Sequence, residues 1–410
     1  MMKSNKCLAR KILCGLLAAG VVGVSGSALA ATYGVNADVG DNINANLTYT
    51  DGKISGVNYG LKATGDASSS KEGKISLTTS KVEINATVIG IQGTNWGSVI
   101  VGNTDTQDVT ISGASQGVKL TKGSRAEITG NQVKISNESK RTLIEISNSM
   151  NTAKRPVQLN IKGKQIELKA ATKIIEANSK YKRAESFPKA SVILGDDYTE
   201  LLDMKGGIGI SAANNTEIIG NAKDINLVVN STAKTYGMQA TGDAAKVQLT
   251  AKDNLLVDVS GIGAKAVYSS AASAKVNLAG NDVKIQAKGT DAPVYGVNSE
   301  TGSNVSISGN TVEISTAGGK NDSYGKTGSS AIYADESNIK VDANKIVVNT
   351  DKAKENAYAV YGNCGSHLTL GKDANSEVHI SSSSEGNAMG VVVATASTSA
   401  STAAASQVNI

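Results

Sequence analysis

Aromatic residues, proline, histidine and cysteine are scarce in this chain of 410 residues. It holds one Trp, one Phe, three Pro, two His and three Cys. Globular enzymes usually build their cores from Leu and aromatic side chains, so this composition argues against an ordinary enzyme fold. Low proline content favours long β-ladders, because proline lacks the backbone N–H that a ladder position donates. The abundant apolar residues, Val and Ile, are those that pleated strands prefer.

The start of the chain has the pattern of a secretory signal peptide. Its basic residues are Lys3, Lys6, Arg10 and Lys11. An apolar run follows over residues 12–24, and small residues stand at Ala28 and Ala30. The run is too short to span a membrane comfortably and ends in a cleavage pattern. We therefore predict a signal peptide over residues 1–30, cleavage after Ala30, and export.

Removal of this leader changes the charge and the cysteine count. The leader carries four of the 41 basic residues and none of the 36 acidic ones, so the mature chain is close to neutral. A near-neutral chain gives no reason to expect nucleic-acid binding. Cys7 and Cys14 also leave, and Cys364 alone cannot form an intramolecular disulfide. We interpret Cys364 as a small apolar filler, with a reactive thiol as the alternative.

The clearest pattern is a repeat, which reads best over residues 276–285, 305–314 and 339–348. Each copy holds two short strands that alternate apolar and polar residues. A unit of this size cannot bury its apolar face alone, so the copies must stack. Related copies fill residues 56–410, which we divide into about twelve coils of three short strands. Their irregular lengths favour an all-β, right-handed parallel β-helix and exclude solenoids with a strict six-residue repeat.

A small residue followed by Asn marks the corner between the second and third strand of a coil. Such pairs begin at Gly102, Gly130, Gly220, Gly280, Gly309 and Ala343. Asn tolerates the left-handed backbone conformation that we expect at this corner. Stacked amides can also hydrogen-bond along the rod. We favour such a structural ladder over a polar ligand-binding stripe.

Tyrosines recur near the start of the coils, commonly between an apolar and a small residue. They are Tyr59, Tyr236, Tyr268, Tyr295, Tyr333 and Tyr361. If the neighbouring valines face inward, the tyrosines form an exterior stripe that could bind glycans or another protein. If the tyrosines face inward, they form a core stack. The residues next to the tyrosines support both arrangements, and we favour the core stack.

Two coils carry insertions, and solenoids often place binding residues on such loops. The coil over residues 173–207 contains Tyr181, Arg183, Phe187, Asp196 and Asp197. The insertion over residues 318–326 contains Tyr324. We name these six residues as binding candidates, while insertions that are merely tolerated remain the simpler interpretation. Asp196 and Asp197 resemble an acid pair, but Gly-Asp-Asp is more often a turn.

No residue set has the spacing of a catalytic or metal site. The two His residues, His367 and His379, lie one coil apart without an evident carboxylate partner, and with Cys364 they do not have zinc-site spacing. We therefore name no catalytic, cofactor-binding or metal-binding residue.

A signal peptide followed by Val/Ile/Asn/Gly-rich coils with Tyr-Gly starts and Gly-Asn corners resembles the passenger region of Gram-negative autotransporters. The resemblance covers the whole chain and implies export, surface display and a role in adhesion or aggregation. It also implies a C-terminal β-barrel in the outer membrane, which this sequence lacks. The sequence stops at residues 407–410, which read as the second strand of a coil, and we interpret this as truncation.

These observations predict a signal peptide (1–30), an N-terminal cap (31–55) and a β-helical passenger (56–410). We expect a non-enzymatic protein at the cell surface or outside the cell that acts in adhesion or cell–cell interaction. Expected partners are a host or bacterial surface protein or glycan, and self-association is open. The alternative is a secreted β-helical polysaccharide lyase or hydrolase, for which three or more carboxylates stacked on one face would be the mark.

Overall fold

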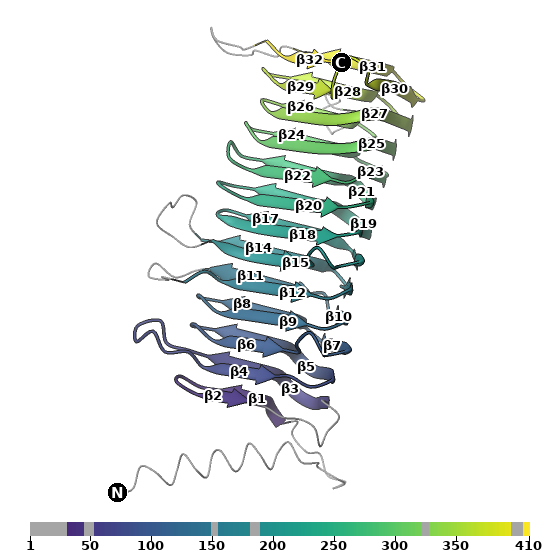
Figure 1. The fold of residues 1–410 in the computed structure, drawn as a ribbon. Coiled ribbons are helices and arrows are strands. Elements are labelled where there is room, and N and C mark those ends of the chain that lie inside the picture. Colours follow the sequence, from purple (N-terminus) through teal and green to yellow (C-terminus); the bar gives the residue numbers. More distant parts are fainter. Residues whose placement is uncertain (1–30, 45–52, 149–154, 181–188, 322–327, 395–404) are drawn as a thin grey trace, which may run out of the picture.

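The computed structural model describes residues 31–44, 53–148, 155–180, 189–321, 328–394 and 405–410. The predicted signal peptide lies outside them. The described residues form an all-β parallel solenoid of about eleven turns without helices, close to the twelve expected coils (Figure 1). Every pairing between named strands is parallel, and each strand inside the described stack pairs with strands of the preceding and following coils. The predicted fold class is therefore confirmed.

The strands stack in three columns, which follow one another along the chain in each coil. The first column contains β1 (Ala31–Ala37), β8 (Gln116–Thr121), β11 (Ile144–Asn148), β14 (Lys173–Ser179), β17 (Ile208–Ala213), β24 (Tyr295–Glu300), β26 (Ser329–Asp335), β28 (Ala357–Asn363) and β31 (Ala388–Val393). The second column contains β2 (Asn42–Asn44), β4 (Lys74–Leu77), β6 (Ser98–Val101), β9 (Arg125–Thr129), β12 (Gln158–Lys162), β15 (Ala190–Leu194), β18 (Thr216–Ala222), β20 (Lys246–Ala251), β22 (Lys275–Ala279), β29 (His367–Leu370) and β32 (Gln407–Asn409).

The third column contains β7 (Asp108–Gly113), β10 (Gln132–Ser136), β13 (Gln165–Lys169), β16 (Leu201–Gly206), β23 (Asp282–Gly289) and β30 (Glu377–Ser384). Longer strands pass through a corner and contribute to two columns. Those that join the third column to the first are β3 (Lys53–Thr64), β5 (Lys81–Thr94), β19 (Asp224–Thr241) and β21 (Asn254–Ser270). Those that join the second column to the third are β25 (Asn304–Gly318) and β27 (Asn338–Ala353).

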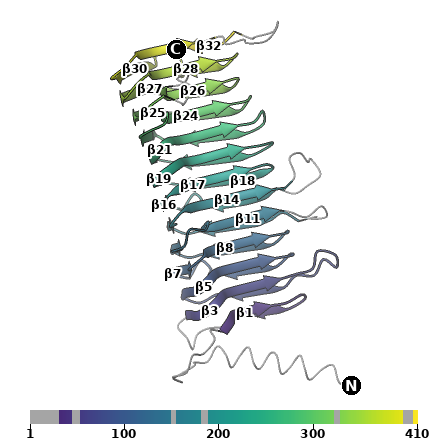
Figure 2. The ribbon, with the colours of Figure 1, turned by 180° about the vertical axis from the view of Figure 1, so that it is seen from behind.

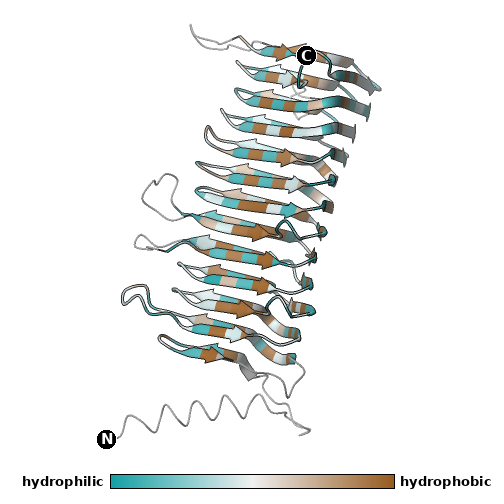
Figure 3. Cartoon of the chain, in the orientation of Figure 1, coloured by the Kyte–Doolittle hydropathy of each residue, from teal (hydrophilic) through white to brown (hydrophobic). Residues whose placement is uncertain are grey.

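The core is a set of aliphatic stacks that run along the rod. In the first column, Val267, Val297, Ile332 and Val360 occupy one register position on successive coils, and all four are fully buried. Figure 3 shows the corresponding alternation of hydrophobic and hydrophilic residues along the strands. Each added coil thus buries the apolar edge of the last one, which is why single coils cannot fold alone.

A bend in the first column interrupts the alternation. Gly296 and Val297 are successive residues and both are buried. A Cβ atom on Gly296 would lie 2.8 Å from the Ile314 side chain and 2.6 Å from the carbonyl oxygen of Ala331, so this glycine faces the crowded interior. Two inward residues in a row shift the phase of the alternation, and Tyr295 before them is turned outward.

The Asn corners differ in part from expectation. The side-chain amide of Asn344 donates a hydrogen bond of 3.0 Å to Oδ1 of Asn310 on the preceding coil, as a ladder requires. The expected left-handed backbone at these asparagines is wrong, because none of them has a positive φ. At the first corner Gly102 adopts it instead, with φ near 70°. The corner asparagines therefore do not supply the left-handed backbone, and Asn310 and Asn344 instead join two coils through their side chains.

The strands near both ends of the described stack pair with the neighbouring coil. β1 pairs with β3 and β2 pairs with β4, so residues 31–44 form the first rung, and their predicted role as a cap stays a prediction. At the other end β32 pairs with β29 of the second column, where the sequence predicted it. The view from behind shows the same regular stack (Figure 2). Among the described residues no helix is long and apolar enough to cross a membrane.

Candidate binding face

The tyrosines of the described residues gather on the outside of the first column, with the exception of Tyr198. They occupy two register positions, not one. The first holds Tyr33, Tyr59, Tyr236, Tyr295 and Tyr358, and the second holds Tyr268, Tyr333 and Tyr361. The recurring tyrosine motif of the sequence therefore corresponds to two parallel lines of side chains.

The favoured core position of the tyrosines is wrong. Val267 before Tyr268 and Ile332 before Tyr333 are fully buried in the aliphatic stack, so the tyrosines face the other side of their strands. Tyr295 and Tyr333 are only 7% and 8% exposed, yet neither belongs to the continuous hydrophobic core. Their burial comes from packing against other outward side chains of the same face.

The tyrosines of the last coils form what we call the tyrosine cluster, made of Tyr268, Tyr295, Tyr333, Tyr358 and Tyr361. The rings of Tyr333 and Tyr361 are stacked, with centroids 5.4 Å apart and an interplanar angle of 5°. The Tyr295 ring meets that of Tyr333 edge-on at 5.3 Å, and the Tyr358 ring lies 5.1 Å from that of Tyr361. Such ring pairs add stabilisation beyond the area they bury and hold the face in a fixed shape.

Charged groups frame the cluster at its N-terminal side. The Lys265 ammonium lies 4.1 Å from the Tyr268 ring centroid and 3.8 Å from a carboxylate oxygen of Glu300. The Tyr268 hydroxyl donates a hydrogen bond of 3.1 Å to Glu300. Burial lowers the pKa of Lys265 and raises the pKa of Tyr268, and the charge of Glu300 opposes the first shift and adds to the second. These groups fix one another in orientation.

Neither Lys265 nor Glu300 was singled out from the sequence. They belong to successive coils and approach only because β21 and β24 stack in register. The short motif around each tyrosine contains no signal for such a partner. Sequence reasoning could have found the pair only with the register of the coils already known.

A smaller aromatic group lies at the other end of the same face. The rings of Tyr33 and Tyr59 are 5.5 Å apart, and Lys62 extends over the Tyr33 ring at 4.6 Å. The Lys62 ammonium also donates a hydrogen bond of 3.0 Å to the Tyr33 hydroxyl. Between the two groups the face carries charged pairs such as Lys119 and Glu145, whose charged atoms are 3.2 Å apart. The first column therefore presents aromatic surface near both ends of the stack.

Four of the six loop residues proposed from the sequence lie outside the described residues. They are Tyr181, Arg183, Phe187 and Tyr324, and their binding role stays a prediction. Asp196 and Asp197 lie in the turn between β15 and β16, after Gly195 with φ near 71°.

Asp196 has a structural role in that turn. Its Oδ1 accepts a hydrogen bond of 3.0 Å from the backbone N–H of Tyr198, and its own N–H donates to the Thr199 hydroxyl at 3.0 Å. Asn103 and Thr106 build an equivalent turn three coils earlier, with bonds of 2.9 and 3.0 Å. The turn needs a short oxygen-bearing side chain, and Asp196 supplies it.

His367 lies on β29, His379 lies on β30, and Cys364 lies in the turn after β28, near Tyr361 of the tyrosine cluster. His379 hydrogen-bonds to Glu377 on the same strand, and His367 is exposed. Cys364 is partly exposed in the turn after β28, with φ near 49°. Within the described ranges no group of three or more His, Cys, Asp or Glu side chains is placed to hold a metal ion.

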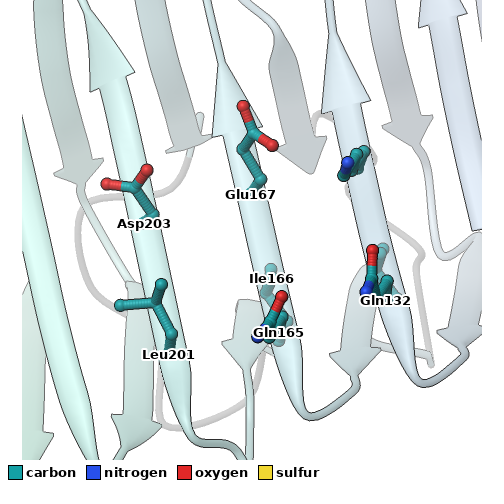
Figure 4. Close-up of a pocket in the computed structure, with 8 residues that line it drawn as sticks. Gln132, Gln165, Ile166, Glu167, Leu201 and Asp203 are labelled. Carbon is teal, nitrogen blue, oxygen red and sulfur yellow. The ribbon is translucent and has the colours of Figure 1, made fainter.

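Carboxylates on the described strands line up on neighbouring coils only in pairs, such as Glu145 with Glu176 and Glu167 with Asp203. The second pair borders a small pocket on β10, β13 and β16, where both side chains point away from the strands (Figure 4). Lys134, the register partner of Glu167 on β10, also lines this pocket. The pocket measures about 80 Å³. This is far below the few hundred Å³ of a usual ligand site.

A larger depression of about 640 Å³ lies over the corner between the third and first columns. It is open to solvent and its lining is mostly small and polar, including Ser231, Thr232, Ser260, Lys288 and Thr290. It has neither the enclosed shape nor the aromatic lining that small-molecule sites share. The tyrosine cluster is therefore the strongest candidate for a binding surface among the described residues.

Comparisons with known proteins add no assignment. No protein-family model, no curated protein and no solved structure matches this chain. The resemblance to autotransporter passengers stands on the sequence features alone, and the fold supports its β-solenoid part.

Proposed function

We propose that this chain is an exported, surface-displayed or secreted β-solenoid that acts without catalysis in adhesion or cell–cell interaction. In this proposal it is the passenger of an autotransporter, and its partner is a surface protein or glycan of a host or bacterial cell. The observation that carries the proposal is the concentration of tyrosines on one face of a long rod.

Tyrosine suits recognition for a physical reason. Its ring supplies apolar contact area, its hydroxyl forms hydrogen bonds, and its two side-chain torsions cost little entropy when they are fixed. Tyrosine is also enriched among the residues that dominate binding energy in interfaces. In the tyrosine cluster the rings already hold one another in place, so a partner would meet a preorganised surface.

The rod supports the proposal through its stiffness. Continuous parallel ladders and aliphatic stacks join every described coil to the next, so the face keeps its shape along the solenoid. Weak contacts repeated along such a face act together, because each contact holds the next one in place. Export, which adhesion requires, follows from the predicted signal peptide.

Bead adhesion tests the proposal. The full chain is expressed in a Gram-negative host, and the processed protein is purified, sequenced at its N-terminus and coupled to fluorescent beads. We expect an N-terminus at Ala31 and adhesion of the beads to cultured epithelial cells or to bacterial cells. A variant with Tyr268, Tyr358 and Tyr361 replaced by Ser should lose most of this adhesion, because these partly exposed side chains contribute the accessible part of the cluster.

Tyr198→Ser is the matched control, since Tyr198 is 84% exposed and lies outside the tyrosine cluster. It should adhere like the wild type, and circular dichroism should show both variants folded. Equal adhesion of the triple variant and the wild type would reject the tyrosine cluster as the binding surface. No adhesion of the wild type to any cell would reject the proposed function.

A further inference from the structure

We propose that Tyr333 and Tyr361 form a site of oxidative cross-linking, at which a dityrosine bond joins two successive coils of the rod. The reaction requires a one-electron oxidant of the peroxidase or peroxyl class. The proposal rests on the arrangement of the rings and is independent of the proposed role in adhesion.

The two rings are placed to react with each other. Tyr333 and Tyr361 occupy the same register position on β26 and β28, one rung apart. Their rings are nearly parallel, with centroids 5.4 Å apart. Side-chain rotation alone brings an ortho carbon of one ring against an ortho carbon of the other, because the parallel ladder already fixes the two backbones side by side. This proximity gives intramolecular coupling a high effective concentration.

Partial burial favours coupling within one chain. Tyr333 is 8% exposed, and the Tyr295 and Tyr358 rings contact the pair on its two sides. A radical formed on Tyr333 is therefore shielded from other protein molecules and from dissolved reductants, while the Tyr361 ring remains in contact. Tyr361 is the more exposed partner and is the one that a dissolved oxidant reaches first.

The step balances in atoms and electrons. Each phenol gives one electron to the oxidant and one proton to a base or to water, which leaves two phenoxyl radicals. The radicals join through one new carbon–carbon bond between ortho positions. Each of these two carbons then loses its hydrogen to its phenolic oxygen as the ring becomes aromatic again. The net loss is two electrons and two protons, and one hydrogen peroxide that accepts them becomes two waters.

Such a bond would supply a covalent link that the mature chain otherwise lacks. Cys364 is its only cysteine, so it cannot make an internal disulfide. A link between Tyr333 and Tyr361 would close a loop of one coil and restrict the unfolded chain. The last coils of the described stack would then resist unfolding as a unit.

Peptide mapping after mild oxidation tests the proposal. The processed full chain is oxidised at low concentration with photoactivated ruthenium tris-bipyridine and persulfate, alkylated, and digested with trypsin. Cleavage after Lys326, Lys340, Lys354 and Lys372 separates the two tyrosines into peptides 327–340 and 355–372. We expect these peptides to appear joined, at the sum of their masses less two hydrogen atoms, with fragment ions that place the bond at Tyr333 and Tyr361.

Variants and alternative products make the outcome decisive. Tyr361→Phe keeps the ring and should abolish the joined peptide, whereas Tyr358→Phe should leave it in place. The joined species should also unfold at a higher urea concentration than the unoxidised protein. A bond between Tyr358 and Tyr361, confined to peptide 355–372, would overturn the proposal. So would coupling only between separate chains, or oxidation of the exposed Tyr198 without any coupling.

Discussion

The hydroxyl of Tyr268 and the carboxylate of Glu300 are joined by a hydrogen bond of 3.1 Å between successive coils on the outside of the solenoid. Glu300 also lies 3.8 Å from the Lys265 ammonium, so one carboxylate serves two partners. Through this hydrogen bond an outward tyrosine contacts the ion pair of Lys265 and Glu300. Val267, the residue before Tyr268, is fully buried on the other side of the strand.

Glu300→Gln should destabilise the protein by about 1–2 kcal/mol. Glutamine keeps an acceptor for the Tyr268 hydroxyl but removes the negative charge that offsets the burial of Lys265, so the pKa of Lys265 should fall further. Urea unfolding measures the change. Glu313→Gln is the control, because its partner Lys284 is 3.3 Å away in an exposed pair, and it should cost less than about 0.5 kcal/mol. Equal effects of the two substitutions would contradict a special role for Glu300.

The tyrosine cluster should make the fold sensitive to alkali. Burial, with the charge of Asp335, raises the pKa of Tyr333 above its ordinary value of 10.0. The unfolded chain therefore loses this proton first as the pH rises, so the stabilising contribution is complete below about pH 10 and falls above it. The loss for one such group is about 1.4 kcal/mol per pH unit.

Urea unfolding midpoints measured from about pH 8 to pH 11 test this decline of stability with pH. Tyr333→Phe should reduce the decline, because phenylalanine has no proton to lose in the unfolded state. Tyr198→Phe should leave the decline unchanged, since that side chain is largely exposed. A decline of the same steepness in Tyr333→Phe and in the wild type would show that other groups cause it.

Gly60→Ala should destabilise the first-column bend by about 1–3 kcal/mol. A Cβ atom there would lie 2.5 Å from the carbonyl oxygen of Gly90 and would also collide with the Ile84 side chain. Gly390 occupies the equivalent position in the last described coil, where the nearest atom to a Cβ is 3.9 Å away on Ile380. Gly390→Ala should therefore be neutral or slightly stabilising. Thermal unfolding of the two variants tests the difference, and a similar shift in both would refute crowding as the cause.

Asp196 should be replaceable by Asn but not by Ala. Asn103 builds the equivalent turn with an amide oxygen, so Asp196→Asn should change the free energy of unfolding by less than about 0.5 kcal/mol. Asp196→Ala removes the acceptor for the backbone N–H of Tyr198 and should cost about 1 kcal/mol. Both variants should adhere to cells as the wild type does. Loss of adhesion in the stable Asp196→Asn protein would return Asp196 to the binding candidates.

The sequence by itself determined the solenoid. The chain repeats short strands that alternate apolar and polar residues. One such unit cannot bury its own apolar face, so the units are stable only when they stack on one another. The assignment of strands to coils also follows from it: residues 276–285, 305–314 and 339–348 stack on one another in register. The scarcity of proline and the role of Asp196 in a turn could be interpreted from local chemistry alone.

Only the tertiary structure decided which side of the first column the tyrosines take. Val267 and Tyr268 alternate on one strand, and either side chain could fill a core. The bend at Gly296 puts two successive residues inward and shifts the alternation, so tyrosines at two different register positions share one face. Lys265 and Glu300 meet there because the coils stack in a fixed register. That register is set by the packing of each coil on the next, so it cannot be derived from the sequence of one coil alone.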